Sequence, residues 1–124
     1  MIHEELTGTI LGAAVEVHRL LGPGLLESVY VRCLVHELEL RGVAVRVEVP
    51  CDVEYKGTVL PSCYRIDLLV ADVVVVEVKA VDKVHPIHRA QLLTYLRLSG
   101  SRVGLLLNFN VEVLLRDGLT RVVV

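Results

Sequence analysis

Long hydrophobic runs are missing from this sequence, although 53% of its residues are hydrophobic and its mean hydropathy is +0.58. The most apolar stretch, residues 68–81, is interrupted by Asp72, Glu77 and Lys79. A membrane-spanning helix needs roughly 20 mostly apolar residues, so the sequence argues against a membrane span. The apolar residues are largely valines in short runs, a pattern that predicts a buried sheet.

Cysteine pairs are missing as well. Cys33, Cys51 and Cys63 are odd in number and form no CxxC pair, which argues against both a zinc site and a disulfide framework. Acidic residues follow Met1, where a secretory signal would carry basic ones, so we expect no signal or transit segment. The compartment we expect is a reducing cytoplasm.

A basic excess is the third absence, since the formal net charge is −2 and the pI about 6.2. A protein that coats nucleic acid needs a basic domain, and the charge of this chain argues against that class of protein. The net charge does not exclude an enzyme with a local basic rim, which Lys83, His85, His88 and Arg89 would form where they crowd together.

No repeat, low-complexity tract or linker interrupts the chain, so we expect a single domain over residues 1–124. Pro50 is expected to end the first strand, and Asp117-Gly118 to turn a C-terminal hairpin. The order ααβββββαβββ predicts an α/β (α+β) fold, a mixed sheet flanked by helices. The expected helices cover residues 4–21, 25–41 and 86–99, and the expected strands cover residues 43–49, 64–70, 74–80 and 103–109, with hairpins over 53–60 and 111–124.

Two charged residues lie on one face of the most apolar strand. Alternate residues of a strand share a face, so Glu77 and Lys79 lie with Val73 and Val75. Charges beside a core strand are costly unless they are paired or bound to metal. One interpretation is a Glu77–Lys79 ion pair that satisfies itself.

Asp67 supports a second interpretation, because it lies in the preceding strand, ten residues before Glu77. If the strands pair antiparallel with these two residues opposed, the carboxylates repel unless a cation lies between them. Hard oxygen ligands suit Mg²⁺ or Mn²⁺. A two-residue loop at Ala71-Asp72 would instead oppose Asp67 to Val76, so we predict a three-residue loop, or a bulge that restores the phase.

Glu27 is a further acidic candidate. It shares a helix face with Tyr30 and Leu34, at i, i+3 and i+7. We expect that face to be buried, so that Glu27 points towards the interior. A first-turn glutamate favoured by the helix dipole is the alternative.

Several short motifs resemble one known family. Residues 24–30, GLLESVY, match GxxExxY, the motif that names the GxxExxY family, which resembles and is usually grouped with the PD-(D/E)xK nucleases. The resemblance runs nearly end to end and implies a restriction-endonuclease-like PD-(D/E)xK core. Its other parts are YRIDLLV at 64–70, EVKA at 77–80, AQLLTYL at 90–96 and GLLLNF at 104–109.

The resemblance implies catalytic roles. Asp67 and Glu77 would hold Mg²⁺ or Mn²⁺, with Glu27 assisting directly or through water. Lys79 would position or polarise the attacking water, or stabilise the charge that develops on phosphorus.

Four other residues are candidates for substrate contacts. Gln91 and Tyr95, at i and i+4, look like a QxxxY element that contacts substrate or the lysine, with a solvent-facing pair as the alternative. Arg65 shares a face with the aspartate two residues later, where it either neutralises the carboxylates or meets a phosphate. His88 either contacts a phosphate with its basic neighbours or belongs to a solvated helix start.

The first hypothesis for function is therefore a metal-dependent phosphodiester hydrolase, a nuclease that acts on DNA or, less favoured, RNA. A non-catalytic nucleic-acid or protein-binding module that keeps the fold is the alternative, and a subunit whose activity needs a partner is a third. The apolar excess in a small chain also leads us to expect a homodimer that buries a sheet edge or a helix face.

Overall fold

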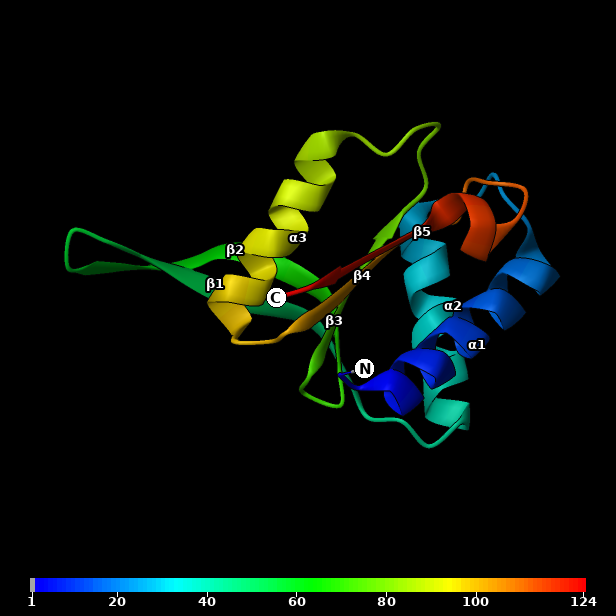
Figure 1. Ribbon diagram of the computed structural model, residues 1–124, viewed down its shortest axis with the longest axis horizontal. Helices are drawn as coiled ribbons and strands as arrows, with labels where there is room; N and C mark the ends of the chain where they lie inside the picture. Colours follow the sequence, from blue (N-terminus) through cyan, green and yellow to red (C-terminus); the bar gives the residue numbers. More distant parts are fainter. Residues whose placement is uncertain (1) are drawn as a thin grey trace.

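A computed structural model describes residues 2–124. It contains a five-stranded sheet in the order β1-β2-β3-β4-β5, with α1 and α2 on one face and α3 on the other (Figure 1). Within residues 2–124 only the β3–β4 pairing is parallel, so the expected mixed sheet flanked by helices is confirmed. The elements are α1 Glu4–Leu21, α2 Glu27–Leu40, β1 Val45–Tyr55, β2 Thr58–Val70, β3 Val74–Lys79, α3 Pro86–Ser99, β4 Val103–Asn108, the π-helical turn η1 Leu114–Gly118 and β5 Leu119–Val123.

Two hydrophobic clusters cover the two faces of the sheet. The larger packs α1 and α2 against Val74, Val76 and Val78 of β3, and the smaller packs α3 against Val75. The alternation predicted for β3 is therefore confirmed, and it places Glu77 on the α3 face. None of the helices in residues 2–124 combines the length and apolar character needed to cross a bilayer.

The loop between β2 and β3 sets the phase of the central strands. Val70 pairs with Val74, so residues 71–73 form the loop, and the first two of them have positive φ values of 51° and 60°. The three-residue loop is thus confirmed. Continued by three residues along each strand, this register brings Asp67 opposite Glu77.

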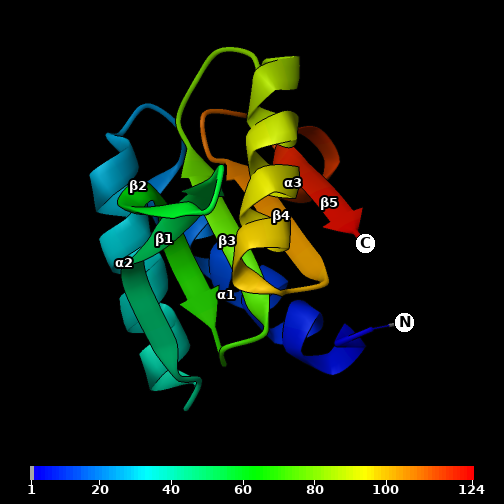
Figure 2. The same cartoon turned by 90° about the vertical axis from the view of Figure 1, so that its left-hand side faces the viewer.

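β1 and β2 extend beyond the sheet as a two-stranded arm, residues 50–65, because β3 pairs only with the last three residues of β2 (Figures 1 and 2). The turn at Lys56-Gly57 is confirmed. The prediction that Pro50 ends a strand is wrong, since Pro50 lies inside β1 and pairs with Arg65. An edge strand tolerates proline because one side of its backbone has no neighbouring strand, so no N–H is needed there for a sheet hydrogen bond.

Both strands of this hairpin change the face that they bury where the arm leaves the sheet. Val45 and Leu68 pack in the cluster under α1 and α2, whereas Val49 and Ile66 pack in the cluster under α3. Glu48 lies between these positions with a left-handed φ of 51°. Simple alternation along β1 and β2 therefore fails at this point.

The predicted C-terminal hairpin is wrong. The chain forms η1 and then returns as β5, which pairs antiparallel with β4 from Leu107 and Leu119 onward. Leu114 is buried against the α1 and α2 cluster, which draws η1 over the sheet. A Cβ atom at Gly118 would collide with the Asn108 carbonyl oxygen, so only glycine fits this close approach.

Candidate active site

Two carboxyl groups meet where the β2–β3 ladder ends. The Asp67 backbone N–H donates to Glu77 Oε1 at 3.1 Å, and the Val78 N–H donates to Asp67 Oδ2 at 2.9 Å. Each side chain therefore accepts a bond from the opposite strand beyond the last paired residues. Glu77 is only 5% exposed, so the pair lies at the margin between core and solvent.

The electrostatics of this pair depend on burial. The pKa of Glu77 is raised from 4.5 to about 9, chiefly by burial and then by the negative charge of Asp67. The Asp67 N–H and the charge of Lys79 oppose the rise, while a hydrogen bond between the two carboxyl groups adds to it. Without a cation Glu77 therefore retains its proton at neutral pH.

Lys79 and Glu27 lie at the carboxyl end of β3. Lys79 is half-buried, two residues beyond Glu77 on the same face. Glu27 begins α2, and its Oε2 accepts a bond from the Ala80 N–H at 3.2 Å. The expectation that Glu27 points into the interior is wrong, since the residue is exposed. It lies at the start of α2, and its side chain extends to the backbone just after β3.

Tyr30, the tyrosine of the GxxExxY motif, fixes the start of α2. Its hydroxyl donates to the Gly22 carbonyl at 2.6 Å and accepts from the Leu25 N–H at 3.2 Å. Its ring stacks on Phe109, with centroids 4.6 Å apart. The tyrosine thereby anchors the turn that delivers Glu27 to the end of β3.

Tyr95 of α3 packs beside the carboxyl pair. It is 8% exposed and makes an edge contact with Tyr64 at 5.6 Å between centroids. Its pKa is raised to about 12, first by burial and then by the negative charges of Glu77 and Asp67. The solvent-facing alternative is therefore wrong for Tyr95, and Gln91, one turn earlier on α3, is half-buried.

His88 lies close to the other end of the site. Its Nδ1 accepts from the His85 N–H at 3.2 Å, within a reciprocal cap at the start of α3. The pKa of His88 is lowered by burial and then by the positive charges of Lys79 and His85, while Glu27 acts in the opposite direction. The first turn of α3 thus faces the Lys79 end of β3.

Asn108 is a positioning residue that the sequence did not lead us to single out. It is 2% exposed, and its side-chain amide bonds both the N–H and the carbonyl of Val81, at 3.1 and 2.9 Å. These bonds hold the loop that leaves β3 towards α3. The signal in the sequence was an asparagine at the end of an otherwise apolar run, where a buried amide would need hydrogen-bond partners.

The structure does not bring Arg65 to the carboxyl pair. Tyr64 and Ile66 both pack in the α3 cluster, so Arg65 between them points to the other side. Its guanidinium lies 3.8 Å from Glu48, and the two side chains are 67% and 71% exposed. The prediction from spacing is wrong because the hairpin changes face between Ile66 and Leu68.

The donor set of the pair is suited to a hard cation, since two oxygen ligands crowd together where burial and repulsion already disfavour their charge. A divalent ion would relieve that repulsion. Among residues 2–124, however, no three His, Cys, Asp or Glu side chains gather closely enough to hold an ion by themselves. Glu27 is a further acid at this end of β3, and its carboxylate accepts a hydrogen bond from the Ala80 N–H.

Comparison with known proteins identifies the class. The sequence profile of the PD-(D/E)XK nuclease superfamily matches residues 4–122, and the chain belongs to this superfamily. No curated protein and no solved structure matches the chain. The mixed five-stranded sheet with its flanking helices is consistent with the fold of these nucleases, which typically use divalent metal ions.

Proposed function

We propose that this protein is a metal-dependent phosphodiester hydrolase that cleaves DNA, with residues 1–124 forming one nuclease domain of the GxxExxY type. The observation that carries the proposal is the buried contact between Asp67 and Glu77, with Lys79 on the same face. An ordinary Glu77–Lys79 ion pair would not need a second carboxyl group in the same place. Membership of a nuclease superfamily supports a nuclease-type function.

In this proposal Asp67 and Glu77 hold Mg²⁺ or Mn²⁺, and Glu27 joins them directly or through water. A bound divalent ion would offset the charge that builds on phosphorus and make a bound water more acidic. Lys79 orients the attacking water or adds positive charge where the phosphate becomes more negative. The burial of Glu77 keeps bulk water from screening these charges.

The first turns of α3 supply contacts to the substrate. His88 faces the Lys79 end of the site and would contact a phosphate, while Gln91 and Tyr95 continue along the same helix towards the carboxyl pair. Arg65 would meet the DNA backbone only where the arm approaches it, because its side chain points away from the pair.

The test is cleavage of supercoiled plasmid and short duplexes by the purified chain, in Mg²⁺, in Mn²⁺ and in EDTA. Wild type and Glu54→Gln, a matched change on the exposed arm, should cleave in either metal. Asp67→Asn and Lys79→Ala should lose cleavage by a factor of about 100 or more, the scale seen when a catalytic charge is removed. A folded wild type that binds DNA without cleaving it in either metal would replace the proposal with a binding module.

A further inference from the structure

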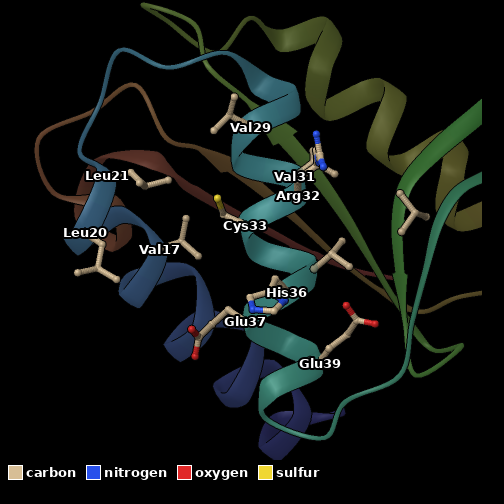
Figure 3. A pocket seen from close by; sticks show the side chains of 12 residues that line it. Val17, Leu20, Leu21, Val29, Val31, Arg32, Cys33, His36, Glu37 and Glu39 are labelled. Atoms are coloured by element: carbon tan, nitrogen blue, oxygen red, sulfur yellow. The ribbon is translucent and has the colours of Figure 1, made fainter.

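A groove of about 750 Å³ runs beside α2 on the side of the sheet opposite the carboxyl pair. Figure 3 shows α2 at its centre, with α1 on one side and β1 on the other. Its lining is largely apolar and includes Val17, Leu20 and Leu21 of α1, Val29 and Cys33 of α2, and Val47 of β1.

The outward face of α2 carries two charges without a partner. Arg32 and Glu39 are seven residues apart and both exposed, so they project from the same side of the helix, roughly 10 Å apart. Within residues 2–124 neither forms an ion pair, whereas the neighbouring Glu37 bonds Arg41 at 2.8 Å. One positive and one negative charge are therefore left facing out across the groove.

We propose that this face binds a second copy of the chain, with the two α2 helices antiparallel about a two-fold axis beside Val35 and His36. In a symmetric interface each contact occurs twice with the roles exchanged. An axis at this place sets Arg32 of each copy against Glu39 of the other, because the two residues lie equally far from it along α2. The charge pattern is thus complementary to itself.

The apolar side chains fit the same arrangement. The two-fold rotation reverses the helix direction but leaves α1 of both copies on the same side of the α2 pair. Leu40 lies at the end of α2 and is 69% exposed. In the dimer it lies near the start of α2 and the end of α1 of the other copy, where Val29 is 38% exposed and Leu20 is 66% exposed. Large apolar side chains that face solvent in the single chain would become buried in the dimer.

The proposed dimer leaves the carboxyl pair accessible, since that pair lies under α3 on the other face of the sheet. Each dimer would then present two open sites. A partner with a different sequence would need its own matching acid and base at the same spacing, whereas a second copy already carries them. The inference does not depend on the proposed nuclease activity.

The experiment is sedimentation velocity from about 1 to 100 µM with wild type, Arg32→Glu, Glu39→Arg and the double exchange of both. We expect wild type and the double exchange to dimerise. Each single variant should dissociate at least tenfold more readily, because it sets like charges together twice. An equimolar mixture of the two single variants should recover the dimer, since every contact in the mixed pair is again opposite in sign.

Arg97→Glu, at the end of α3 on the far face of the sheet, is the matched control and should dimerise like wild type. Melting curves of each variant show that it remains folded. A wild type that stays monomeric at 100 µM, single variants that dimerise as well as wild type, or a mixture that forms no mixed dimer would each overturn the proposal.

Discussion

The proton that Glu77 retains beside Asp67 makes the stability of the fold depend on pH in a defined direction. The folded protein binds this proton far more tightly than the unfolded chain does, because the pKa of Glu77 is raised from 4.5 to about 9. The stabilising contribution is therefore complete below pH 4.5 and is lost as the pH rises towards 9. In that window stability falls by about 1.4 kcal/mol per pH unit, or roughly 3 kcal/mol between pH 6 and 8.

For a domain of this size, that loss lowers the melting temperature by on the order of 10 °C. Glu77→Gln keeps the shape of the side chain and an oxygen for the Asp67 N–H, but it cannot ionise. We expect melting curves in EDTA to show a steep fall for wild type and a much shallower one for this variant, with Glu54→Gln behaving as wild type. Parallel curves for wild type and Glu77→Gln would refute the protonation of Glu77.

Three further outcomes are expected. Millimolar Mn²⁺ should raise the melting temperature of wild type at pH 8 by several degrees, since an ion that binds only the folded state stabilises it, and Asp67→Asn should remove most of that rise. Lys79→Ala should abolish cleavage yet bind Mn²⁺ as well as or better than wild type in calorimetry, because a nearby positive charge is gone. Tyr30→Phe should lose about 0.5–1.5 kcal/mol in urea denaturation, since the part-buried Gly22 carbonyl loses its donor; unchanged stability would contradict the anchoring of α2.

The register of the two central strands, β2 and β3, could be predicted from the sequence, because Asp67 and Glu77 must lie on the same face of the sheet. The valines of β3 are buried on both faces of the sheet. A loop of the right phase between β2 and β3 is needed to place Asp67 and Glu77 on the same face. Alternation and the cost of misplacing a carboxylate were therefore enough to predict a three-residue loop. The bounds of α1 and α3 followed from strong periodicity and from Pro86 at the start of α3.

The remaining differences come from tertiary contacts that leave no local pattern. Nothing in the residues around Glu48 signals its left-handed backbone, so the change of face that turns Arg65 away could not be foreseen. Pro50 breaks a strand only when both sides of its backbone must be paired, and β1 turned out to be an edge strand. The tail followed the burial of Leu114 rather than the turn signal at Asp117-Gly118.

The position of Glu27 was predicted only in part. Its place at the start of α2 and its contact with the end of β3 depend on the anchor that Tyr30 makes with Gly22 and with Phe109, which lies far along the chain. Helical spacing predicted which face Tyr30 would bury. It could not predict that Glu27 would meet a backbone N–H rather than the other carboxyl groups.

The most direct test of the central claim is diffraction from crystals grown or soaked in Mn²⁺, recorded for anomalous scattering. The proposal predicts a manganese peak about 2.2 Å from a carboxylate oxygen of both Asp67 and Glu77, with Glu27 at the same distance or one water away. Asp67→Asn crystals treated in the same way should lose the peak. A map with no manganese at this pair, in crystals whose wild-type protein remains folded, would contradict the claim that these carboxyl groups form a metal centre.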